Sequence, residues 1–143
     1  MVKKDVVEVV PDALMEFMQQ MNEWECEFFD KRKDGFAEGK DDIGLKQAYA
    51  SKLKIIFDAF AFKDKSNYGR LIDLGCTRPA TYDPGTDVVE LVASSNGSMV
   101  VQVQQVKGAE SCSRFYLIMK GGEWKIKKRE VLSFDGKWQR VAL

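Results

Sequence analysis

The residues of this chain that suit acid–base chemistry are tyrosines and aspartates that lie near one another in the sequence. The pairs are Tyr49 with Asp58, Tyr68 with Asp73, and Tyr82 with Asp83. An aspartate base beside a tyrosine donor can move a proton when both lie in an apolar cavity. However, Tyr49 and Asp58 are about two and a half helical turns apart, and no pair has a spacing that requires a shared site. We therefore expect no enzyme activity.

The chain contains no histidine, which removes the commonest general base, metal ligand and proton switch near neutral pH. Ser–His–Asp and Cys–His catalytic arrangements are excluded for the same reason. Cys26, Cys76 and Cys112 are odd in number and widely spaced. They predict neither a disulfide framework nor a zinc site, and they suit a reducing cytosol. We therefore expect no metal, no cofactor and a cytoplasmic location.

Four acidic residues gather around a polar connector between two amphipathic segments: Asp34, Glu38, Asp41 and Asp42. Two interpretations are open. In the first, the side chains solvate and cap helix ends, as Asp41 or Asp42 would do at the start of a helix. In the second, the cluster is an electrostatic landing site for a basic protein partner, because opposite charge raises the association rate and helps to select the partner.

The segment from Arg78 to Pro84 is predicted to be a loop, because it contains two prolines and is followed by Gly85. Arg78 and Tyr82 belong to residue types that are favoured in binding hot spots. Loops also carry function more often than cores do. We therefore include Arg78 and Tyr82 among the candidate partner-binding residues. A structural role for Tyr82 beneath the loop is the alternative.

The composition indicates one globular domain, which we expect to span residues 1–143 with a frayed leader at residues 1–10. Hydrophobic residues make up 45% of the chain, enough for a core. Lysine and arginine number 22 and balance 22 acidic residues, so the net charge is zero. This balance argues against a dedicated nucleic-acid binder and a polybasic membrane patch. No apolar run approaches the ~20 residues that a membrane-spanning helix needs.

Two stretches in the first half have the spacing of amphipathic helices. The first begins at Pro11 and is expected to end near Lys33, with Gly35 as its terminator. The second follows Asp41 or Asp42, with Phe62 at its end. For residues 68–76, a short helix and an irregular strand are both open. The two apolar stripes comprise Leu14, Phe17, Met18, Met21, Trp24 and Phe28, and Leu45, Tyr49, Leu53, Ile56, Phe57 and Phe60.

The second half alternates apolar and polar residues, which predicts antiparallel strands. Strands are expected at 87–93, 98–106, 113–120, 123–134 and 137–141. Gly121-Gly122 and Asp135-Gly136 supply tight hairpin turns. Phe115, Leu117, Met119, Trp124 and Ile126 form an apolar face, and Lys125, Lys127, Lys128 and Arg129 form a solvated one. A lone hairpin is marginal in water, so the fold class is α+β, with two helices covering one face of a curved sheet.

This order of elements, with the closing motif Gly121-Gly122-Glu123-Trp124-Lys125-Ile126, resembles the nuclear-transport-factor-two-like superfamily, which includes ketosteroid isomerase-like proteins. The resemblance covers the chain from Pro11 onwards. It implies a cone-shaped antiparallel sheet with N-terminal helices packed on its concave face. Within the superfamily, the motifs at 74–79 and 81–84 and the closing Asp135-Gly136-Lys137-Trp138 resemble the bacterial immunity branch.

That resemblance implies a bacterial, cytoplasmic protein of a polymorphic toxin system, which binds and neutralises a cognate toxin without chemistry of its own. The expected partner is the toxin, with no nucleic acid and no membrane, and a homodimer is left open. The alternative is a small-molecule-binding or ketosteroid isomerase-like enzyme that uses the cone cavity. An enzyme needs an open pocket with a perturbed carboxylate. A binding protein can instead fill the cone with side chains, such as Met15, Met18, Met21, Met99 and Met119.

Overall fold

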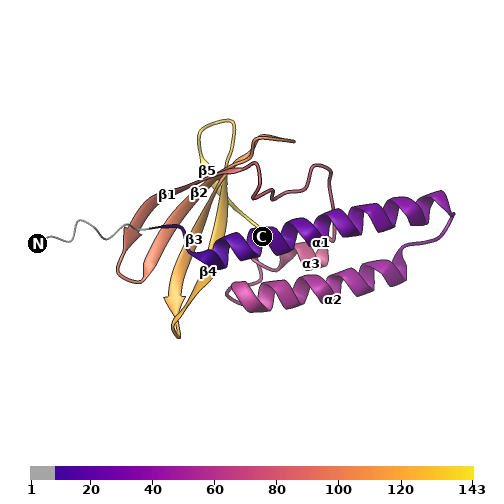
Figure 1. The fold of residues 1–143 in the computed structure, drawn as a ribbon, viewed down its shortest axis with the longest axis horizontal. Coiled ribbons are helices and arrows are strands. Elements are labelled where there is room, and N and C mark those ends of the chain that lie inside the picture. The colour runs from indigo at the N-terminus through magenta and orange to yellow at the C-terminus, as the bar shows by residue number, and fades with distance from the viewer. Residues whose placement is uncertain (1–8) are drawn as a thin grey trace, which may run out of the picture.

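The computed structural model describes residues 9–143, so the predicted frayed leader falls mainly on residues 1–8, outside the described part. In the described chain, helices come first and strands follow (Figure 1). The helices are α1 (Asp12–Ala37), α2 (Ile43–Phe60) and α3 (Gly69–Ile72), and the strands are β1 (Val88–Ser95), β2 (Ser98–Gln104), β3 (Cys112–Lys120), β4 (Glu123–Leu132) and β5 (Trp138–Val141). This confirms the α+β class, and α3 settles the alternative for residues 68–76 in favour of a short helix. The predicted end of the second helix at Phe62 is wrong, because α2 ends at Phe60.

The strands form one antiparallel sheet in the order β1-β2-β3-β4-β5, each paired with its neighbours in the sequence. Gly121 and Gly122 have φ angles of 59° and 81°, as the tight turn between β3 and β4 requires. The sheet is curved and does not close on itself, and the first part of α1 crosses beside it (Figure 1). The predicted curved sheet is confirmed.

The apolar stripes of α1 and α2 face the inner surface of this sheet, and the core lies between them. Phe17 is at its centre, with ring centroids 5.5 to 6.2 Å from those of Phe60, Tyr82 and Phe115. Phe57, Val101, Leu117 and Ile126 are also buried there. Of the methionines expected to fill the concave side, Met18 and Met21 are fully buried and Met15 and Met99 partly buried, whereas Met119 is exposed.

The first helix is longer than the sequence pattern predicted. It continues through Gly35 to Ala37, so the predicted end near Lys33 is wrong. The termination occurs at Gly39, whose φ is 73°. Its N–H donates to the carbonyl of Phe36 (3.1 Å), and the N–H of Lys40 donates to the carbonyl of Gly35 (2.9 Å). These are the two hydrogen bonds of a Schellman motif, which needs a left-handed residue that glycine adopts easily.

Arg129 does not belong to a solvated strand face, and that prediction is wrong. The pairing of β3 with β4 shifts between Tyr116 and Leu117, which leaves Lys127 as an extra residue in a bulge. The shift turns Arg129 inward, where it is only 9% exposed. Its guanidinium lies 5.2 Å from the ring centroid of Tyr82 and donates to the carbonyl of Ala142 at 3.1 Å. Lys127 itself is exposed, as expected.

The helix pair extends beyond the sheet. Figure 1 shows the second half of α1 and the first half of α2 projecting away from the strands, joined by the connector at their tip. We call residues 29–45 the far end of the helix pair. The segment between α3 and β1 runs beside α1 before the chain enters the sheet (Figure 1). The far end is thus the part of the helices that no strand covers.

Candidate functional site

Large apolar side chains are exposed at the far end of the helix pair. Phe36 in α1 is 62% exposed and Ile43 at the start of α2 is 65% exposed. A single exposed apolar residue is ordinary, but here the half-buried ring of Phe29 belongs to the same end of α1. Grouped apolar side chains rimmed by charge mark contact surfaces in soluble proteins.

The structure brings the four predicted acidic residues together around the connector. The carboxylate of Asp42 forms ion pairs with Arg32 at 3.1 Å and with Lys46 at 3.8 Å. Asp41 accepts a hydrogen bond from the N–H of Ile43 at 3.1 Å, which satisfies one free donor at the start of α2. Glu38 pairs with Lys40 at 3.0 Å. The capping interpretation therefore has direct support at Asp41, and Asp34, Glu38 and Asp41 still face solvent.

The loop that carries Arg78 is held against α1 by a buried carboxylate, Glu25, which is 1% exposed. Glu25 accepts hydrogen bonds from the backbone N–H groups of Thr77 (2.7 Å) and Thr81 (2.8 Å). Its charge is paired with Arg70 of α3 at 2.9 Å. Sequence reasoning missed Glu25, although its position four residues after Met21 and three before Phe28 places it on the apolar stripe. A charge on such a stripe signals a buried partner.

Two further contacts complete the attachment of this loop. The guanidinium of Arg70 lies 5.1 Å from the Trp24 ring centroid and also donates to the carbonyl of Gly75 at 3.3 Å. Asn22 of α1 donates to the carbonyl of Tyr82 at 2.6 Å. Both ends of the loop are therefore anchored to α1, and the residues between them project from a fixed backbone.

Arg78 and Tyr82 are placed very differently by this anchored loop. Arg78 has a half-exposed side chain that pairs with Asp30, and its guanidinium lies 4.7 Å from the ring centroid of Phe29. Tyr82 is 1% exposed and packs in the core, where burial raises the pKa of its hydroxyl. Tyr82 thus takes the structural role that the sequence left as an alternative, and its side chain is out of reach of a partner at this surface.

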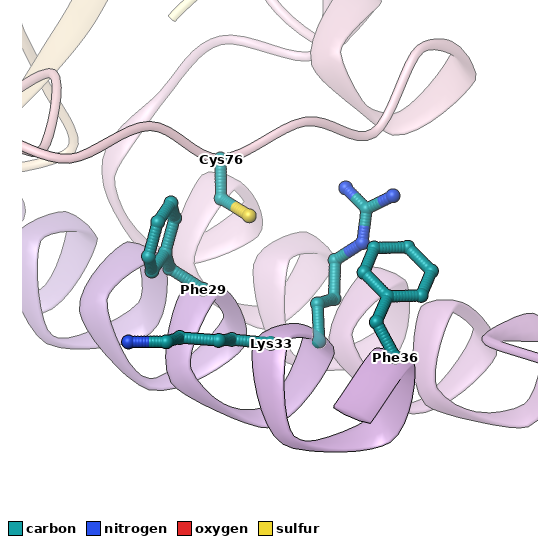
Figure 2. Close-up of a pocket in the computed structure, with 5 residues that line it drawn as sticks. Phe29, Lys33, Phe36 and Cys76 are labelled. Carbon is teal, nitrogen blue, oxygen red and sulfur yellow. The ribbon is translucent and has the colours of Figure 1, made fainter. Parts of the chain in front are cut away.

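A pocket of about 330 Å³ opens between α1 and this loop. Figure 2 shows Phe29, Lys33 and Phe36 on α1, with the Cys76 side chain pointing from the loop towards the helix. Arg32 completes the lining, and its guanidinium lies 5.4 Å from the Phe28 ring centroid and 5.6 Å from that of Phe36. Aromatic walls beside guanidinium and ammonium groups are suited to hold an anchor side chain of a protein partner.

Three tyrosines of the described chain donate to carboxylates, and none of these pairs was considered from the sequence. Tyr49 donates to Glu27, Tyr68 donates to Asp58 at 2.6 Å, and Tyr116 donates to Glu130 at 2.7 Å. Burial raises the pKa of Tyr49 to about 12, and the hydrogen bond from Tyr49 lowers the pKa of Glu27. The hydrogen bond from Lys54 likewise lowers the pKa of Asp58. Such groups are not poised to exchange protons near neutral pH.

Residues 9–143 contain neither a metal-binding cluster nor a helix that could span a membrane. No group of three or more acidic or cysteine side chains is arranged so that it could hold a metal ion. No helix in this range is both long and apolar enough to cross a membrane.

Comparison with known proteins gives a consistent result. The family described as NTF2 fold immunity protein matches residues 9–142. Immunity protein RhsIA of Dickeya dadantii (strain 3937) is 35% identical over 133 residues, which cover 92% of this chain and 93% of that protein. No solved structure matches the chain significantly. Because the family match includes the helix pair, the anchored loop and the whole sheet, this chain belongs to the family of NTF2-fold immunity proteins.

Proposed function

We propose that this immunity protein neutralises a cognate bacterial protein toxin by binding it tightly with the far end of the helix pair, and that it catalyses no reaction. The observation that carries the proposal is the group of apolar side chains, Phe36 and Ile43 above all, that stands beyond the sheet without cover. Bound there, the protein would occlude the active site or the substrate path of the toxin. It would act in the bacterial cytoplasm.

The filled interior supports binding over the alternative, an isomerase-like enzyme. Such an enzyme needs an open apolar cavity that encloses a carboxylate with a perturbed pKa. The concave side of this sheet is instead packed with Phe17, Met18, Met21 and Phe115, all fully buried. The three carboxylates that accept hydrogen bonds from tyrosines, Glu27, Asp58 and Glu130, have lowered pKa values. A protein that only binds needs no cavity.

Exposed charge around the contact surface would set the rate of association. Asp34, Glu38 and Asp41 form an acidic rim at the tip, and Arg78 stands on the loop side. Charges at a rim act mainly on the association rate and on its salt dependence. We assign the protein no nucleic-acid or membrane partner, in keeping with its zero net charge.

Co-expression with the toxin encoded beside this gene tests the proposal. We expect growth to be restored, and the two proteins to purify as one complex. Failure of the wild-type chain both to restore growth and to bind the toxin removes the proposal.

The acidic rim has its own test. Asp34→Lys with Glu38→Lys should slow association and reduce its salt dependence. The control, Glu16→Lys with Glu23→Lys, makes the same change in net charge at exposed positions of the other half of α1. Equal association rates for both double variants would leave the acidic residues with a capping and solvating role alone.

A further inference from the structure

We propose that the pocket between α1 and the anchored loop receives a carboxylate side chain of the toxin, held by Lys33 and Arg32 against the rings of Phe29 and Phe36. This inference rests on the proposed function and specifies the chemistry of the contacting segment: an aspartate or glutamate on an acidic stretch of the toxin surface. It differs from the acidic rim, which would attract basic groups.

The walls of the pocket are apolar on two sides. Phe29 and Phe36 are two turns apart on α1 and therefore stand along the same side of the helix. The Cys76 side chain faces them from the loop (Figure 2). Arg78 covers the Phe29 ring at 4.7 Å, which keeps that wall in place. The methylene groups of an aspartate or glutamate can lie against such walls while the charged end reaches the cations.

The cations of the pocket have unused capacity. Within residues 9–143, no carboxylate lies at ion-pair distance from the ammonium of Lys33, although several lysines of this chain are paired. One terminal nitrogen of Arg32 pairs with Asp42, and the side chain remains 24% exposed. No hydrogen bond from its other terminal nitrogen lies within the described chain, so a carboxylate from outside can supply an acceptor there.

Charge decides between a carboxylate and other occupants. Asp42 and Asp30 already neutralise Arg32 and Arg78, so the charge left to decide is that of Lys33. A lysine or arginine of the toxin would be placed beside this ammonium, and like charges in contact are unfavourable. A purely apolar side chain would fill the walls but leave the ammonium of Lys33 without a counter-charge. A carboxylate satisfies both requirements, since charge-assisted hydrogen bonds are stronger than neutral ones.

The experiment uses the complex of the full chain with its cognate toxin domain, and measures affinity and rate constants. Lys33→Glu should weaken binding by about tenfold or more, because it removes the cation and repels the carboxylate. Phe36→Ala should also weaken it by about tenfold. The control is Lys31→Glu, an exposed residue of the same helix turn that does not line the pocket; we expect less than a threefold change.

The carboxylate pocket and the acidic rim predict opposite effects of Lys33→Glu on binding to the toxin. If only the acidic rim mattered, the added negative charge would speed association with a basic toxin. Unchanged or tighter binding of Lys33→Glu would overturn the carboxylate pocket while wild-type binding keeps the proposed function intact. If a carboxylate-to-lysine substitution in the toxin restores binding to the Lys33→Glu variant, the carboxylate pocket is supported. The proposal would also be overturned if the substituted chains, measured without the toxin, differed in molar mass from the wild-type chain. Such a difference would show that a second copy of the chain occupies the pocket.

Discussion

The two halves of α1 carry similar residues but have opposite environments. Phe17, in the half that lies on the sheet, is completely buried, whereas Phe36 at the far end is 62% exposed. The difference is that β2, β3 and β4 cover the first half, and only α2 and the anchored loop accompany the second (Figure 1). Phe28, between these two phenylalanines, is buried against Trp24 and against Tyr49 of α2. The apolar stripe is therefore core as far as the sheet or α2 covers it, and only its last turns remain available for a partner.

This comparison also separates stability from function. Burial of a phenylalanine stabilises a fold by roughly 1.5 to 3 kcal/mol, and the protein forgoes that gain at Phe36. Substitutions in the first half of α1 should therefore act on folding, and those at the far end on binding.

The same substitution in both halves of α1 tests this difference most directly. Phe17→Ala should lower the free energy of unfolding by about 3 to 5 kcal/mol, because it removes a ring packed against Phe60, Tyr82 and Phe115. Phe36→Ala should change it by less than about 0.5 kcal/mol. Urea unfolding of both variants checks this. Equal losses would show that Phe36 is covered in solution.

The next effect concerns the buried carboxylate that ties the loop to α1. Glu25→Gln should cost about 3 kcal/mol, because it leaves Arg70 with a buried, unpaired charge. Glu23→Gln, at an exposed position of the same helix, is the matched control and should be nearly neutral. Thermal or urea unfolding distinguishes the two variants. A neutral Glu25→Gln would mean that the loop is held by other contacts.

Alanine substitutions at two glycines of the far end should change the stability of the protein in opposite directions. Gly39→Ala should destabilise the protein by about 1 kcal/mol, because alanine is strained at a φ of 73°. Gly35→Ala should stabilise it by about 0.5 to 1 kcal/mol, because Gly35 lies within α1 with open space around its Cα. Unfolding measurements on both variants give the signs. A destabilising Gly35→Ala would indicate that α1 ends earlier in solution.

The smallest effect is a dependence on alkaline pH. Burial raises the pKa of Tyr49 to about 12, and it also raises the pKa values of Tyr68, Tyr82 and Tyr116. Because an unfolded tyrosine has a pKa of about 10, the folded state holds these protons more tightly. The resulting stability is complete below about pH 10 and is lost as the pH rises towards 12.

The unfolding free energy should therefore decline over that range, and Tyr49→Phe should make the decline shallower. Phenolate absorbance gives an independent readout in the folded protein. Four tyrosines that titrate together near pH 10 before unfolding would contradict the expected protection.

Much of the fold could be predicted from local patterns. The spacings of three and four residues from Leu14 to Phe28 indicated α1, and alternation from Ser113 to Lys120 indicated β3. Gly121-Gly122 and Asp135-Gly136 located the hairpin turns. These signals are local, since helix and strand periods and turn conformations depend on neighbours within a few residues. The site was predicted less well: Arg78 and the acidic connector are at the far end, but the pocket lining of Phe29, Lys33 and Phe36 was not foreseen.

Local patterns in the chain were enough to predict the elements, their order and the apolar faces that had to be covered. The tertiary structure alone decided that Glu25 is paired and buried, that Tyr82 lies in the core, and that Arg129 turns inward at a bulge. It also decided how far the sheet reaches along α1. These outcomes depend on contacts between residues far apart in the chain, and the free energy of a buried charge or an exposed ring is set by those neighbours rather than by the local pattern.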